Sequence, residues 1–233
     1  MSTVPDTICA PVRKFITALT ALPALSGVFN PWRDYDARYD QDETAPSIRA
    51  YNLTHYLAER VGRAKLVLIG EAPGFRGCKF SGIAMTSERI LLGKQRAISP
   101  ENVFLGLKRR TSASFASSDG FIEPTASIVW SLLLQLDIDP RDFILWNAFP
   151  CHPYKGAERL TNRKPLPGEL AATAHILPAL LELSPKTTVV AVGRVAEGAL
   201  NTLALKYSPV RHPAMGGANA FRAGIKTLLK RSA

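Results

Sequence analysis

Four positions that could do chemistry each come at the end of a segment that reads as a short strand. Glu71 follows LVLIG, Asn147 follows FILW, Gly193 follows TVVAV, and His212 follows SPVR. Carboxylates, amides and imidazoles are the side chains that positioned acid–base and hydrogen-bonding chemistry uses. Segments far apart in the chain thus supply an acid, an amide, a bare backbone and an imidazole, and this combination indicates a site.

The loop from Gly70 to Gly74 (GEAPG) differs from the glycine loops that bind nucleotide phosphates. It contains neither G-x-G-x-x-G nor G-x-x-x-x-G-K-[ST]. Pro73 removes a backbone donor and Glu71 would repel an anion, so a phosphate loop is the weaker interpretation. Two alternatives stay open from the loop alone: a catalytic carboxylate, or a glutamate that is merely solvated at a strand-to-helix turn.

Each candidate also has an ordinary structural explanation. A histidine before a proline, as at His212, is more often a surface or capping residue than a catalyst. Asn147 could satisfy a turn at a strand end, and Phe80 could belong to the core. A functional site is therefore indicated only by all of these residues together, and only if the fold brings them close to one another.

Alternating patterns predict an α/β fold. Apolar runs rich in branched residues predict strands over 65–69, 142–147, 187–192 and 208–211. Helical spacing predicts helices over 11–22, 46–62, 125–136, 167–183 with a kink at Pro178, 196–205 and 220–229, and a short one capped near Thr86 and Ser87. Such an order implies a parallel sheet, whose ligands bind beyond the carboxyl ends of the strands.

The remaining segments are predicted to be irregular. Residues 1–10 are expected to form a loose tail and residues 30–44 a loop or surface arm. Residues 99–120 carry Lys108, Arg109 and Arg110 and could face a phosphate backbone or form a solvated insertion. The basic, proline-rich stretch after Asn147 is typical of a binding loop.

Composition favours a globular protein with a polyanionic partner. The 233 residues are 46% hydrophobic and carry a net charge of +10, with a pI near 9.8. The cysteines, at positions 9, 78 and 151, are far apart and odd in number, which argues against disulfides and a structural metal and for a reducing compartment. We find no signal peptide or membrane span and expect a cytoplasmic protein, monomeric by default.

Four short motifs of this sequence together resemble those of a known family. GEAPG at 70–74, FSG at 80–82, the strand end WN at 146–147 and HPAMGG at 212–217 resemble the uracil-DNA glycosylase superfamily, in particular its GEAPG branch. The order and spacing match over 65–225. The resemblance implies one domain over 1–233, with N-terminal helices and an arm over 1–62 and a core over 63–231. That core would be a three-layer α/β/α sandwich around a four-stranded parallel sheet.

The resemblance also implies an activity and residue roles. The family flips uracil out of DNA and hydrolyses its glycosidic bond, because the bond is inaccessible in a stacked duplex. By matched position, Glu71 would hold the attacking water and stabilise the cationic sugar, and His212 would hydrogen-bond O2 of the leaving uracil. Asn147 would read N3–H and O4, Phe80 would stack on the base, and Gly70 and Ala72 would complete the base pocket. The implied DNA contacts are Pro73, Gly74, Gly193, Arg211, Ala214, Gly216 and Met215, the last as a wedge.

This chain departs from the family pattern at several positions. Of the four cysteines that hold an iron–sulfur cluster in the GEAPG branch, Cys151 occupies one place, but the N-terminal pair is missing, so we expect no cluster and no cofactor. Where other branches have an aspartate and a tyrosine, this chain has Ala72 and Gly74. Water activation would then fall to Glu71, and exclusion of thymine would need another wall. The sequence leaves a hypoxanthine or xanthine glycosylase and an inactive DNA-binding protein as alternatives.

Overall fold

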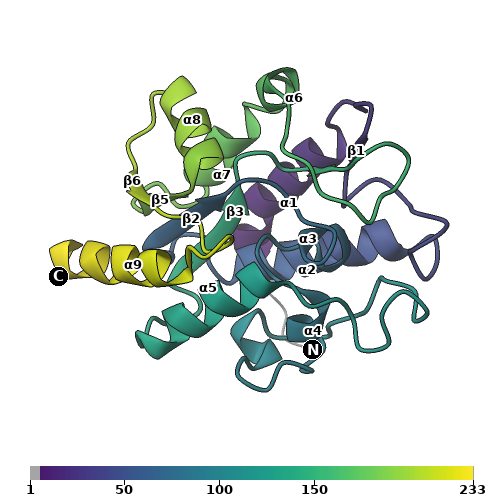
Figure 1. The fold of residues 1–233 in the computed structure, drawn as a ribbon, viewed down its shortest axis with the longest axis horizontal. Helices are drawn as coiled ribbons and strands as arrows, with labels where there is room; N and C mark the ends of the chain where they lie inside the picture. The colour runs from purple at the N-terminus through teal and green to yellow at the C-terminus, as the bar shows by residue number, and fades with distance from the viewer. Residues whose placement is uncertain (1–5, 233) are drawn as a thin grey trace.

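A parallel four-stranded sheet forms the centre of the protein. The computed structural model describes residues 6–232 and places β2 (Leu66–Gly70), β3 (Phe143–Asn147), β5 (Thr188–Val192) and β6 (Ser208–Val210) in the order β3-β2-β5-β6 (Figure 1). All neighbouring pairs run parallel. The predicted strands are confirmed, and each bound agrees to within one residue. Their carboxyl ends therefore meet at one edge, as expected.

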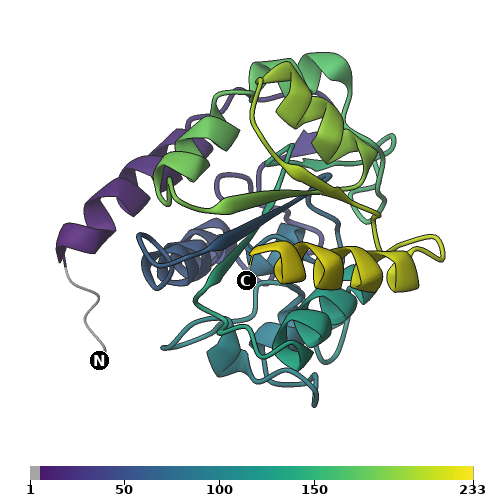
Figure 2. The same cartoon turned by 90° about the vertical axis from the view of Figure 1, so that its left-hand side faces the viewer.

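Helices cover both faces of the sheet. Figure 2 shows α7 (Ile176–Glu182) and α8 (Arg194–Thr202) on one side, and α5 (Pro124–Gln135) and α9 (Ala218–Ser232) on the other. Every residue of β2 and β3 is buried, as strands covered on both faces require. Trp130 of α5 is fully enclosed in the core. The three-layer α/β/α sandwich is confirmed.

The other helices include two that differ from prediction. The remaining elements are α1 (Asp6–Thr20), α2 (Ala45–Ala58), α3 (Cys78–Ser81), α4 (Glu88–Leu91), η1 (Pro100–Asn102) and α6 (Pro167–Ala172). The single kinked helix over 167–183 is wrong, because a turn at 173–175 separates α6 from α7. Pro178 then lies in the first turn of α7, where backbone N–H groups have no partner within the helix, and causes no kink. Helix α1 begins five residues before its predicted start, so the tail prediction is wrong for 6–10, while 1–5 lie outside the described residues.

The segment 30–44 is a loop, but it is not a surface arm. Asp40 forms an ion pair with Arg49 of α2 at 2.7 Å, and both side chains are fully buried. Asp36 likewise pairs with buried Lys79 at 3.0 Å. A short antiparallel pair, β1 (Val28–Phe29) with β4 (His152–Pro153), which the sequence analysis missed, lies beside it. Buried charges without partners are costly, so these pairs hold the segment against α2 and α3.

The segment 99–120 is irregular apart from η1, and one of its attachments to the rest of the protein is a buried carboxylate. Backbone N–H groups of Thr111 and Ser112 donate to the buried carboxylate of Glu88 at 2.7 and 3.0 Å. Leu107 and Phe115, on either side of this anchor, are 64% and 75% exposed. A role of this segment in contacting a phosphate backbone stays a prediction.

Candidate active site

A cavity of about 800 Å³ opens at the carboxyl ends of the strands. The loops after β2, β3, β5 and β6 all contribute to its wall, so the predicted convergence is confirmed as geometry. Most predicted site residues line it: Gly70, Glu71, Ala72, Pro73, Gly74, Asn147, Gly193, Arg211, His212, Ala214 and Met215. Phe80 and Gly216 are not among the lining residues.

Asn147 and Gly70 face each other at the ends of neighbouring strands. They are partners in the register of β2 and β3, and the N–H of Ala148 donates to Gly70 O at 2.9 Å. A Cβ atom at position 70 would lie 2.8 Å from Asn147 Oδ1, which is closer than real Cβ contacts. The glycine therefore makes room for the amide, which is 4% exposed and faces the cavity.

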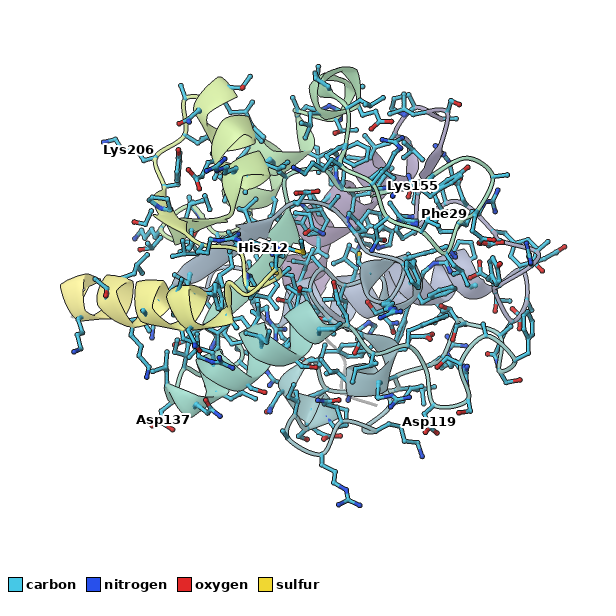
Figure 3. All side chains as sticks on the ribbon, in the orientation of Figure 1. Phe29, Asp119, Asp137, Lys155, Lys206 and His212 are labelled. Atoms are coloured by element: carbon cyan, nitrogen blue, oxygen red, sulfur yellow. The ribbon has the colours of Figure 1, made fainter. Side chains whose placement is uncertain are left out.

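Gly193 makes similar room for His212. Its φ of +89° favours glycine, and a Cβ atom there would lie 3.0 Å from His212 Cβ. Figure 3 shows His212 near the centre of the view, in the loop between β6 and α9. Its Nδ1 accepts from the N–H of Ala214 at 3.1 Å, so a neutral ring carries its proton on Nε2. Burial, with a contribution from nearby Arg211, lowers the pKa of His212 and favours that neutral form.

Glu71 brings an unengaged carboxylate to the cavity. Its backbone is fixed because its carbonyl accepts from the N–H of Phe149 at 3.0 Å. Among residues 6–232, no group hydrogen-bonds to its side chain, which is partly buried. Burial raises the pKa of this carboxyl group and the charge of Lys164, which lines the same cavity, lowers it. The carboxylate is free to hold a water molecule or a ligand.

Strand β4 and the loop after it hold the GEAPG loop in place. The ring of His152 contacts Pro73 O through Nδ1 at 2.8 Å and Arg159 O through Nε2 at 3.0 Å. Asn162 Oδ1 accepts from the N–H of Phe75 at 3.0 Å. Burial lowers the pKa of His152 to about 4, so it is neutral at physiological pH and acts as a structural bridge.

The loop after His212 projects a single apolar side chain. Met215 has a φ of +53° and is 92% exposed at the rim of the cavity. The following Gly216 also has a positive φ, of +74°, and is not among the residues that line the cavity. A methionine so exposed at the mouth of a polar cavity is suited to insert into an apolar region of a binding partner.

Comparison with known proteins identifies the family. A model of the uracil DNA glycosylase superfamily matches residues 59–230. The chain belongs to the uracil DNA glycosylase superfamily. Among solved structures, wild-type SMUG2 from Pedobacter heparinus is similar, with a TM-score of 0.62, 13% sequence identity, and coverage of 94% of this chain and 98% of that one. That likeness shows the fold, and no curated protein sequence matches.

Membership of the uracil DNA glycosylase superfamily makes the position of Phe80 notable. The residue is fully enclosed, and its ring stacks on Phe121 at 4.9 Å between centroids. The ammonium group of Lys79 lies 3.8 Å from its ring centroid. Its ring is thus covered by neighbours in this structure, and its stacking on a base stays a prediction.

Several residues of the cavity wall were missed from the sequence. Met85 lies near Gly70, and Glu123 and Thr125 come from the start of α5. Glu123 is partly buried, its Oε2 atom is fully enclosed without a hydrogen-bond partner, and burial raises its pKa to about 7. The only sequence signal was a glutamate directly before Pro124, which opens the helix.

Metal and membrane features were also sought in the described residues. Residues 6–232 contain no group of three or more histidine, cysteine or acidic side chains arranged to hold a metal ion. Cys78 and Cys151 are buried free thiols. None of the described helices is both long and apolar enough to span a membrane.

Proposed function

We propose that this member of the superfamily is a monofunctional DNA glycosylase that removes uracil from DNA without a metal or cofactor. The observation that carries the proposal is the meeting of three groups in one cavity. They are the unengaged carboxylate of Glu71, the amide of Asn147 and the Nε2–H donor of His212. Hydrolysis of a glycosidic bond in DNA needs a water-binding group, a base-reading group and a donor to the leaving base.

Asn147 is proposed to select the base. Its Oδ1 accepts from uracil N3–H while its Nδ2 donates to O4, and cytosine presents this edge in reverse. The amide is buried and confined beside Gly70, so it is pre-organised for one orientation. A mismatched edge would leave buried polar groups unpaired, which discriminates strongly.

Glu71 and His212 are proposed to carry the hydrolysis. The bond between C1′ and N1 breaks, and its electron pair leaves with uracil. Glu71 stabilises the positive sugar and holds the water whose oxygen bonds to C1′. His212 donates from Nε2 to O2, where negative charge gathers on the leaving base, and the proton lost by water balances the departing anion.

The cavity rim is proposed to bind DNA. Backbone atoms of Pro73, Gly74, Gly193 and the Ala214–Gly216 loop approach phosphates, while exposed Arg211 adds charge. Met215 fills the gap that the flipped base leaves in the stack. The net charge of +10 supports a salt-dependent affinity for nucleic acid.

Base release from an oligonucleotide with a single uracil, in the presence of a chelator, tests the proposal. Uracil should be released, and the strand should break only after alkali. Glu71→Ala should slow release at least tenfold while DNA binding is retained, and Asn147→Asp should weaken release of uracil. Retained DNA binding with no release of uracil would refute the glycosylase and favour the inactive binding protein.

A further inference from the structure

A turn over residues 112–118 is built around one guanidinium group and exposes the ring of Phe115. The guanidinium group of Arg110 donates hydrogen bonds to four backbone carbonyl groups of the turn, those of Ser112, Ala113, Ser117 and Ser118. Several carbonyl groups bound to one side chain fix the shape of the turn. The ring of Phe115, which is 75% exposed, is therefore presented at a defined place on the surface.

This turn packs on Tyr39. The N–H of Ala113 donates to Tyr39 O at 2.8 Å, and the centroids of the Phe115 and Tyr39 rings lie 6.5 Å apart. The guanidinium group of Arg38 lies 5.0 Å from the centroid of the same tyrosine ring, and its side chain is 73% exposed. Arg38 also contacts Glu158 at 3.6 Å, but an exposed ion pair of this kind contributes little and leaves the guanidinium group accessible to another anion. An exposed aromatic ring and an exposed cation thus both lie beside Tyr39.

Contacts connect this group of residues to the wall of the cavity. The ring of His152 bridges Pro73 O of the cavity wall and Arg159 O, at 2.8 and 3.0 Å. The guanidinium group of Arg159 lies 3.4 Å from the carboxylate of Asp36 and 3.5 Å from Tyr35 O. Because the side chain of Tyr35 is 37% exposed, the path of contacts from the cavity to the turn passes a second exposed aromatic residue.

An aromatic–arginine surface therefore extends from the cavity in one direction. It is formed by Tyr35, Arg38, Phe115 and Arg159. Figure 3 shows Lys155 and Asp119, each a few residues from a member of this surface, on the same side of His212. A ligand that occupies the cavity and continues beyond it on this side meets two aromatic rings and two guanidinium groups.

Aromatic rings combined with guanidinium groups fit a single strand of nucleic acid. Successive bases stack on aromatic side chains, while guanidinium groups contact the phosphates between them. In a closed duplex the faces of each base are covered by its neighbours, so only unpaired nucleotides can use an exposed ring. The surface is continuous with the cavity of a protein from a DNA glycosylase superfamily, and this continuity favours a DNA strand over a protein partner.

We infer that the aromatic–arginine surface binds unpaired nucleotides of the substrate on one side of the flipped nucleotide. The inference rests on the proposed function. Phe115 stacks on a base, and Arg38 contacts a phosphate group. Uracil in single-stranded or locally unpaired DNA therefore gains contacts that uracil in a closed duplex lacks.

Oligonucleotides extended on one side of the uracil test this inference. Single-stranded substrates carry about ten further nucleotides on the 5′ side only or on the 3′ side only, and a closed duplex is the third substrate. Single-turnover uracil release over a range of enzyme concentrations gives an apparent Kd and a maximal rate for each. Phe115→Ala should raise the apparent Kd about fivefold or more for one of the two extensions, because it removes one stacked base. The other extension, the duplex and the maximal rate should be unchanged.

Two further substitutions separate stacking from bulk and from charge. Phe115→Leu keeps an apolar side chain without an aromatic face and should weaken binding as alanine does, whereas Phe115→Trp should retain the wild-type Kd. Arg38→Gln should lower the slope of log affinity against log salt concentration by about 0.7 on the same extension, as loss of one phosphate contact to a single strand predicts.

Leu107→Ala is the matched control. Leu107 is 64% exposed in the same segment of the chain. Its neighbour Leu105 donates its N–H to Glu59 at the end of α2, and Arg60 beside Glu59 donates to Phe143 O at the start of β3. Leu107 therefore belongs to the edge of the sheet opposite the cavity, and its substitution should leave every Kd unchanged. Thermal midpoints equal to that of the wild type would show that the exposed-residue variants are folded.

Two outcomes would overturn the inference while leaving the proposed function standing. One is an unchanged Kd of Phe115→Ala for all three substrates, which would leave the surface to a protein partner. The other is equal weakening on both extensions or by the control Leu107→Ala. Absence of uracil release by the wild-type protein from every substrate would instead refute the proposed function itself.

Discussion

Glu123→Gln should change the pH dependence of stability in a direction and by an amount that the structure sets. Burial raises the pKa of Glu123 from 4.5 to about 7 in the folded chain. A raised pKa means that the folded state holds its proton more tightly, so stability is full below about pH 4.5 and falls as pH rises to about 7. At about 1.4 kcal/mol per pH unit, the loss at pH 8 is about 3 kcal/mol.

Glutamine removes this loss because it does not ionise. Urea unfolding of both proteins at pH 4.5 and pH 8 measures the effect, and only the change between the two pH values is compared. This comparison cancels the pH-independent difference between an acid and an amide. Relative to the wild type, the variant should gain about 3 kcal/mol on going from pH 4.5 to pH 8. An equal difference at both pH values would refute the buried, unpaired state of the carboxyl group.

Three further predictions concern the site. Gly70→Ala places a Cβ atom 2.8 Å from Asn147 Oδ1. The value of kcat/KM for uracil release should therefore fall at least tenfold, while DNA affinity is kept. Wild-type kinetics in this variant would contradict the close approach. Uracil release should decline as pH falls, because Glu71 must be ionised and burial raises its pKa. The charge of Lys164 opposes this rise in pKa. Lys164→Met removes that charge, so the acidic limb of the pH–rate profile should move to higher pH. Met215→Ala should leave the thermal midpoint unchanged, since the side chain is 92% exposed, and should slow release from duplex more than from single-stranded DNA. Equal slowing on both substrates would exclude a wedge.

The strands and their convergence could be predicted because their signals are local. Each apolar run has the length of a buried strand and is followed by a residue at which the strand ends, as Gly70 follows Ile69 and Asn147 follows Trp146. Parallel topology then places those ends at one edge without further information. Nothing beyond the order of elements was needed to bring Glu71 and His212 to one cavity.

Other features depend on contacts between distant segments and leave no local signal. Phe80 lies in a motif, but its burial depends on Phe121, which arrives from an irregular loop. The segment 30–44 contains charged residues and was predicted to be a loop or a surface arm, yet Asp40 is buried because it forms an ion pair with buried Arg49. The break between α6 and α7 likewise falls in a stretch whose composition is compatible with a continuous helix.

Glu123 also owes its position to contacts between distant segments, and burial of its carboxyl group has a free-energy cost. An enclosed, unpaired carboxyl group destabilises the empty protein, and packing alone does not require it, because a hydrophobic residue of similar size could fill the space beside Gly77.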